Sequence, residues 1–288
     1  MVPTLEQIEE LHHKIAPSEE AYNLIHTHCV IVARIARMLA HRQNMLFARR
    51  CTLPKDAAEL GAPSAAGAEA VLAGLGTAAG PSDSPATATP ATAAPATATP
   101  AAAAPATATP ANLLAVPPSD GVTGGHVPPR LIDEHLVTIG GLLHDIGTYR
   151  VLKHDGTDGE PLKFAGKKYI KHGLLGYEYL LENGVDEEIA QFARNHTGVG
   201  LTREDVIRQE LPLPPADYVP VNLEQETVMV ADKYNSKSLP PKFVTAASYT
   251  RRAARFGEEN KRRWLELLDQ YGVVDVEPLA AEYHMVVI

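Results

Sequence analysis

The middle of the chain is a low-complexity stretch that divides the remaining segments into two groups. Residues 54–129 are rich in alanine, proline and threonine, and "PATATPATAAPATATPAAAAPATATP" repeats with a period near ten residues. Proline at this frequency fixes φ and removes backbone donors, so neither a helix nor a sheet is expected to persist. We predict a disordered or polyproline-like insertion that acts as a passive spacer, and a core built from residues 1–53 and 130–288.

The segment before the insertion has the pattern of two helices. "TLEQIEELHHKI" begins with a capping-type threonine, and "SEEAYNLIHTHCVIVARIARMLAHRQ" carries apolar residues at helical spacing. One face of the second helix would present Leu24, His28, Ile31, Ile35 and Leu39. An insertion after it would not prevent folding, because loop closure costs only about a few kcal/mol even for a long loop.

The segment after the insertion is also expected to be helical. "RLIDEHLVTIGGLLHDIG" predicts a helix that Gly147 stops, and a loop or small hairpin follows it. Further helices are predicted in "KKYIKHGLLGYEYLLENG", "DEEIAQFARNHTG", "LEQETVMVADKYNSKS" and "TAASYTRRAARFGEENKRRWLELLDQYG". Few segments alternate with period two, so the expected fold class is an all-α helical bundle.

Charge and cysteine usage exclude several classes of protein. The net charge is −9 and no long basic run occurs, which disfavours binding of a nucleic-acid polymer. No pattern pairs Cys29 with Cys51, so a disulfide framework is not expected. The acidic N-terminus lacks the features of a leader, and no run of about 18 apolar residues is present. We therefore expect a cytoplasmic protein without a membrane segment.

Several polar side chains fall on the apolar faces of the predicted helices. His196 ends a buried stripe, Asp232 follows Val228 by one turn, and His28 follows Leu24 by one turn. Taken singly, a histidine there would be a hydrogen-bonded core residue and an aspartate a buried cap or ion pair. Taken together with a His-Asp pair at the end of an apolar helix, they indicate a divalent cation, which offsets buried carboxylate charge and binds imidazole nitrogen.

The motif order resembles that of the HD superfamily of metal-dependent phosphohydrolases. The motifs are "IHTHCVIVA", "GGLLHDIGT" and "VMVADKYNS", while "IKHGLLGYEYL" and "ARNHTGVGLT" resemble the extra histidine motifs of dinuclear members. The resemblance implies that Asp145 bridges two ions. It also implies one ion on His28, His144 and Asp232, and the other on His172 and His196. The ions would be divalent and drawn from Mn, Fe, Co, Ni, Mg and Zn.

One position departs from the family pattern. Many members have lysine directly after "HDIG", where it contacts substrate phosphate, but this chain has Thr148. Among nearby cations, Lys233 is the best placed, and we assign it a catalytic role beside Asp145. Arg150, Lys171 and Arg194 are the predicted substrate-binding residues.

The resemblance implies hydrolysis of a phosphate ester by a metal-activated water. The substrate would be a nucleotide or a similar small phosphorylated metabolite, and the enzyme a phosphomonoesterase or phosphodiesterase. Two alternatives stay open: a dinuclear iron oxygenase of the same fold, and a non-catalytic nucleotide-binding HD module.

Overall fold

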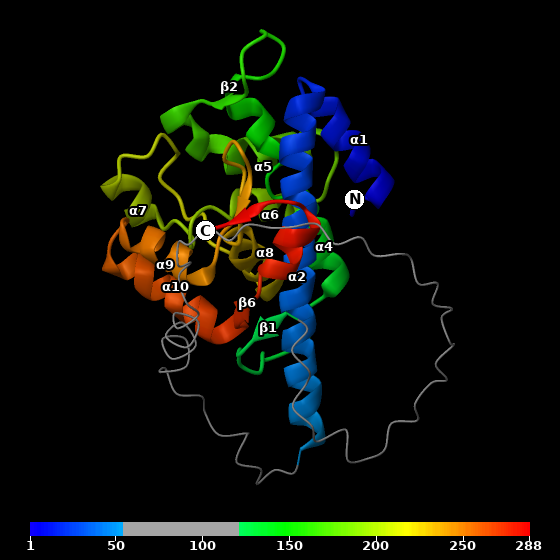
Figure 1. Ribbon diagram of the computed structural model, residues 1–288, viewed down its shortest axis with the longest axis vertical. Helices are drawn as coiled ribbons and strands as arrows, with labels where there is room; N and C mark the ends of the chain where they lie inside the picture. The colour runs from blue at the N-terminus through cyan, green and yellow to red at the C-terminus, as the bar shows by residue number, and fades with distance from the viewer. Residues whose placement is uncertain (54–120) are drawn as a thin grey trace, which may run out of the picture.

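A computed structural model of the chain describes residues 1–53 and 121–288, and the predicted insertion falls largely outside these ranges. Helices dominate the described residues, which confirms the predicted all-α class. Figure 1 shows their arrangement around one long helix, α2. The helices of eight or more residues are α1 (Leu5–Ile15), α2 (Glu19–Thr52), α4 (Glu134–Leu143), α5 (His172–Glu182), α6 (Glu187–Arg194), α8 (Leu223–Asp232), α9 (Ala246–Ala254) and α10 (Glu258–Tyr271).

Side-chain hydrogen bonds cap the first two helices at their N-terminal ends, at the residues that the sequence indicated. Thr4 and Gln7 form a reciprocal capping box at α1, and the Ser18 hydroxyl accepts a hydrogen bond from the amide of Ala21 at the start of α2. These bonds satisfy amide groups that have no partner within the helix. α2 then continues for 34 residues and packs against both α4 and α8, so it forms the spine of the molecule.

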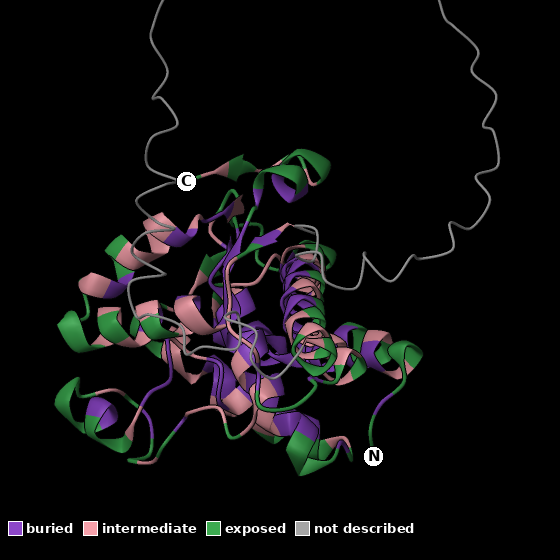
Figure 2. Ribbon diagram, turned by 90° about the horizontal axis from the view of Figure 1, so that it is seen from below, coloured by how far each residue is buried: buried purple, intermediate pink, exposed green. Residues whose placement is uncertain are grey.

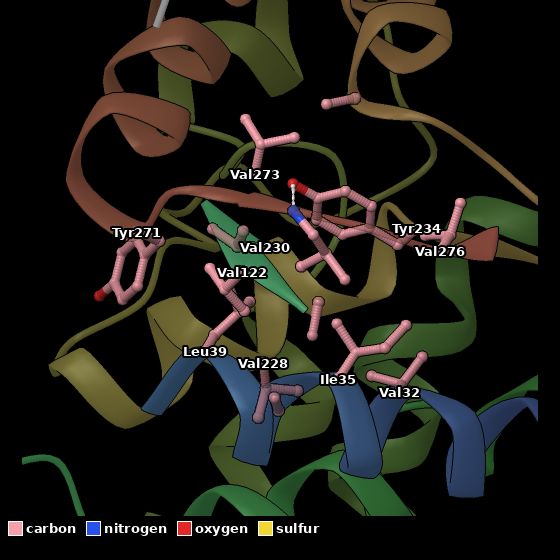
Figure 3. Close-up of a cluster of buried hydrophobic side chains, with 14 of the residues drawn as sticks. Val32, Ile35, Leu39, Val122, Val228, Val230, Tyr234, Tyr271, Val273 and Val276 are labelled. Carbon is pink, nitrogen blue, oxygen red and sulfur yellow. Dashed lines mark hydrogen bonds between the residues drawn. The ribbon is translucent and has the colours of Figure 1, made fainter. Parts of the chain in front are cut away.

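Two large hydrophobic clusters pack along successive parts of this helix. One joins α1, the first half of α2, α4, α5 and α6, and the other joins the second half of α2 to α8, α10 and the C-terminal segments. Figure 2 shows the buried residues gathered at the centre of the molecule. In Figure 3, Val32, Ile35 and Leu39 of α2 face Val228 of α8 and Val122 within the second cluster. The two clusters meet near His28, because Ile25 and Cys29 belong to the first and Ile31 and Val32 belong to the second.

The strands are short and pair locally. β2 (Leu152–His154) and β3 (Lys163–Phe164) form the small hairpin that the sequence allowed, while β4 (Asn235–Ser236), β5 (Lys242–Phe243) and β7 (Val286–Val287) form a three-stranded sheet. β1 (Val122–Thr123) pairs antiparallel with β6 (Val273–Val274). We predicted that residues 122–123 belong to the unstructured insertion, and this prediction is wrong because they form β1. Val122 is fully buried, but two residues beside glycines give no detectable alternation.

Two short helices and two 3-10 segments complete the helical part of the described chain. These are η3 (Ile146–Val151), η4 (Gly166–Lys171), α7 (Arg203–Arg208) and α11 (Glu277–Glu282). α4 ends at Leu143 with His144 as its C-cap, so the prediction that Gly147 stops this helix is wrong. Gly147 instead lies inside η3, where a Cβ would come within 2.0 Å of the carbonyl oxygen of His172. The glycine allows η3 and α5 to touch.

Candidate metal centre

The fold brings all six predicted ligands to one buried place. His28 lies in α2, His144 and Asp145 follow α4, and Asp232 is the last residue of α8. His172 begins α5, and His196 follows the end of α6. Their donor atoms form two groups that could each hold a metal ion, and the groups share Asp145: His28, His144, Asp145 and Asp232 in one, and Asp145, His172 and His196 in the other.

Asp145 directs one carboxylate oxygen to each group. Its Oδ2 lies 3.1 Å from Nε2 of His28, while its Oδ1 lies 3.6 Å from Nε2 of His172 and 3.7 Å from Nε2 of His196. The Thr148 hydroxyl donates a 2.7 Å hydrogen bond to the same Oδ1, which orients the carboxylate. Asp145 therefore has the geometry of a bridging ligand.

Backbone carbonyl groups fix the orientation of three histidine rings. A carbonyl oxygen can only accept a hydrogen bond, so a ring Nδ1 beside it carries the hydrogen and Nε2 keeps a free lone pair. In each case the ring Nδ1 lies 2.7 Å from a backbone carbonyl oxygen. The pairs are His144 with Gly141, His172 with Tyr169, and His196 with Ala193. Asn235 Oδ1 lies 2.8 Å from Nδ1 of His28 and serves the same purpose. Such outer partners align ligands and select the ligating nitrogen.

The Nε2 lone pairs of three of these histidines have no suitable hydrogen-bond donor among the described residues. Nε2 of His172 and Nε2 of His196 lie 3.0 Å apart, and the buried Nε2 of His144 has no hydrogen-bond partner among the described residues. Burial lowers the pKa of His172 to about 3 and that of His144 to about 4, so both rings stay neutral near pH 7. Neutral imidazoles whose lone pairs converge within each of the two groups are suited to binding a cation there. The donor set thus fits metal ions.

Lys237 is a site residue that the sequence did not reveal. Its ammonium contacts Asp145 Oδ2 and lies 3.2 Å from Nε2 of His28. Burial opposes the charged form of Lys237, but Asp145 outweighs it and raises the pKa of the amine. The sequence predicted that the helix of Asp232 continues through this lysine. Because α8 ends at Asp232 and β4 turns the chain back, Lys237 instead faces the metal ligands.

Lys233 joins two ligands of the centre. Its ammonium donates a 2.5 Å hydrogen bond to Asp232 Oδ2 and a 2.9 Å hydrogen bond to the carbonyl oxygen of His196. Burial lowers the pKa of Lys233, and the neighbouring Asp232 partly opposes this effect. Both contacts hold Asp232 beside the segment that carries His196.

A cavity of about 620 Å³ opens beside the ligands. Its cations are Lys233, Lys237 and Arg252, and its one carboxylate is the ligand Asp232. Aromatic and aliphatic side chains form one part of the remaining wall: Phe164, Tyr169, Ile170, Leu201, Leu211, Val244, Tyr249 and Phe256. Polar side chains form the other part: His172, His196, Thr197, Gln209, Asn235, Ser236, Ser238 and Asn260. The charge balance favours an anionic group near the ligands, and the apolar wall favours a less polar body attached to it.

The other predicted substrate-binding residues do not line this cavity. Arg150 and Lys171 line a separate hollow on the far face of η4. Arg194 donates a 2.9 Å hydrogen bond to the Asn195 side chain and stacks over the Tyr218 ring at 4.5 Å. The prediction rested on nearness in sequence to a ligand, and neighbouring residues of a helical turn face different directions.

The structure thus defines a helical domain with a buried, two-part His/Asp centre. Comparison with known families identifies it more closely: residues 120–236 match the HD domain. This range contains five of the six ligands, and His28 lies upstream of it. The chain therefore carries an HD domain, as the motif order indicated.

The curated relatives resemble only part of this chain. An uncharacterized protein of Methanocaldococcus jannaschii is 45% identical over 101 residues, which is 35% of this chain and 49% of that protein. The tRNA (cytidine(56)-2'-O)-methyltransferases of Picrophilus torridus and Thermoplasma volcanium are 35% and 33% identical over 100 residues, or 35% of this chain and 24% of each enzyme. The chain thus spans half or less of the length of these relatives. No solved structure matches it.

Among residues 1–53 and 121–288, no helix combines the length and the apolar composition needed to cross a bilayer.

Proposed function

We propose that this chain is a metal-dependent phosphohydrolase that acts on a small phosphate ester in the cytoplasm. The observation that carries the proposal is the position of Asp145, whose two oxygens face two separate groups of ligand atoms at the end of a cavity lined by cations. Two divalent ions held by these groups would supply an activated water and neutralise phosphoryl oxygens.

The protein side chains support such a reaction in distinct ways. The Thr148 hydroxyl orients the Asp145 carboxylate, and this carboxylate belongs to both ligand groups. Lys237 contacts Asp145 and His28 of the first ligand group and also lines the cavity. It is the cation best placed to contact a phosphoryl oxygen, which is the role of the lysine after "HDIG" in many members of the HD superfamily. Lys233 is held by Asp232 and the carbonyl of His196, so we propose that it positions ligands and adds positive charge.

The rest of the cavity suggests the shape of the ester. Its volume suits a molecule of nucleotide size, and the aromatic rings of Tyr169 and Tyr249 offer flat surfaces. Arg252 makes no ion pair within the described residues and lines the same cavity. We propose a small substrate with a phosphate at the metal centre and an aromatic or aliphatic body against these walls, and no nucleic-acid polymer as partner.

Two readouts test the proposal: release of inorganic phosphate from phosphomonoesters, and formation of the ring-opened phosphomonoester from a cyclic phosphodiester. The panel contains nucleoside monophosphates, sugar phosphates and a cyclic phosphodiester, each with Mn, Fe, Co, Ni, Mg or Zn, and metal content is verified for each protein. We expect hydrolysis by the wild type and a loss of at least about 10³-fold in Asp145→Ala. Asp158→Ala makes the same change at an exposed carboxylate of the β2–β3 hairpin and is expected to retain activity. Metal-loaded wild type that hydrolyses no ester contradicts the proposal.

The same panel separates the alternatives. Oxygen uptake that requires iron and an organic substrate would select the oxygenase, and binding of nucleotides without turnover would select the non-catalytic module. Because two relatives are named as tRNA methyltransferases, oligoribonucleotides with terminal phosphates form an additional arm. Turnover restricted to those oligoribonucleotides would replace the small-molecule substrate by RNA.

A further inference from the structure

A second hollow of about 300 Å³ lies outside the metal centre. Half of its lining residues are basic and none is acidic. The lining residues are Arg150, Val151, Leu152, Lys153, Ala165, Lys168, Lys171 and Leu175. The hollow thus gathers four positive charges within a chain whose net charge is −9.

The 3-10 segment η4 forms the wall between this basic hollow and the metal centre. A 3-10 helix has three residues per turn, so every third residue shares a face. Lys168 and Lys171 line the basic hollow, as does Ala165 just before them. Gly166, Tyr169 and His172 line the cavity of the metal centre. The two hollows share no lining residue, and one turn-like segment separates them.

The lysines of the basic hollow have no protein anion to neutralise them. Lys153, Lys168 and Lys171 make no ion pair or side-chain hydrogen bond with any residue in the described ranges. Arg150 pairs with Glu182 at 3.0 Å on the exposed side and stacks over the Tyr179 ring. The stretch 150–171 contains six Lys or Arg and only three Asp or Glu. Two of those acids bond within the hairpin tip, Asp155 to Thr157 and Asp158 to His154.

We propose that this basic hollow is an anion-binding site for a small molecule that carries two or more linked phosphate groups. Like charges held close together repel one another, and a bound polyanion removes that repulsion. Lysine serves as a point charge toward phosphate, and several converging lysines match several phosphate oxygens. A concave site of this size suits a compact polyanion, whereas a nucleic-acid polymer would need an extended basic stripe.

Calorimetric titration with inorganic pyrophosphate and tripolyphosphate tests the site. EDTA is present throughout, so that metal bound at the other centre does not contribute. The test variant is Lys153→Ala with Lys168→Ala. The matched control is Lys163→Ala with Lys167→Ala, which removes the same charge from the same stretch at exposed residues that line neither hollow.

We expect one molecule of tripolyphosphate to bind per chain, and the test variant to weaken binding at least tenfold. The matched control and Lys237→Met, which alters the metal-centre cavity, are expected to change it less than threefold. Equal weakening in both double variants would show general attraction to a basic surface and overturn the proposal. Loss of binding in Lys237→Met would place the anion in the other cavity, and failure of the wild type to bind either polyphosphate, even where it binds RNA, would also overturn it.

Discussion

Replacing Gly147 by alanine is expected to disturb the fold and the metal centre together. A Cβ at Gly147 would lie 2.0 Å from the carbonyl oxygen of His172 and 2.3 Å from the amide nitrogen of Gly176. Ordinary contacts of this kind exceed 3.0 Å, so the shortfall is about 1 Å. Both atoms belong to the backbone of α5, and no side-chain rotation can relieve the clash. Overpacking costs about 1–3 kcal/mol, and a clash between backbones belongs at or above the upper limit.

The same displacement would separate two ligands. Asp145 directly precedes η3, and His172 begins α5, so a shift of about 1 Å between these elements would misplace one ligand against the other. We expect urea unfolding to show a loss of about 3 kcal/mol in Gly147→Ala, and metal analysis to show weaker retention of one ion.

A control variant separates steric from conformational effects. Gly184 has a φ of +75°, and a Cβ added there would meet no atom within 4 Å. Gly184→Ala therefore carries only the cost of a left-handed backbone, about 1 kcal/mol. A Gly147→Ala protein that unfolds within about 1 kcal/mol of the wild type and binds metal equally well would refute the steric account of this glycine.

Three further predictions address single residues. Lys237→Met removes an ammonium that contacts Asp145, so metal binding is expected to tighten. In the same variant kcat/KM for the ester is expected to fall by about 10²-fold. Weaker metal binding would contradict the assignment. His172→Ala is expected to lower metal content from two ions to one per chain, and loss of both ions would show that the two groups are not separable. Burial lowers the pKa of His12 to about 4 from an ordinary 6.5, so its neutral form contributes stability that is present above pH 6.5 and is lost as pH falls toward 4. The expected loss is about 3 kcal/mol relative to His12→Gln, measured by urea unfolding between pH 7 and pH 4, and parallel pH profiles would exclude it.

Helical periodicity and motif order were sufficient to predict which six His and Asp side chains the fold brings together. His28 and Asp232 fall on apolar faces one turn beyond Leu24 and Val228, so the sequence alone indicated that each points inward. Their convergence with His144 depended on the packing of α2 against α4 and α8, which the spacing of apolar residues made possible. The ring orientations could not be predicted in this way, because they depend on carbonyl groups such as that of Gly141.

Two features could not be predicted from the sequence because they depend on backbone geometry. The role of Gly147 comes from a close approach to α5, and no local pattern distinguishes such a glycine from a helix stop. Arg150 and Lys171 lie next to ligand-bearing segments, but the three-residue turn of η3 and η4 directs them to the basic hollow. Closeness in sequence to a ligand therefore indicated which basic residues lie near the metal centre, but it did not indicate which cavity their side chains face.

Thr148 and Lys237 contact opposite carboxylate oxygens of Asp145. In many HD relatives a lysine after "HDIG" supplies the phosphate-binding charge, and here Thr148 is buried and bonded to Asp145 Oδ1. A lysine at position 148 would have to occupy that enclosed space beside the bridging carboxylate. Lys237 reaches the opposite oxygen, Oδ2, from the segment after Asp232. A positive charge therefore lies beside Asp145 but comes from the segment after α8, while the Thr148 hydroxyl orients the carboxylate.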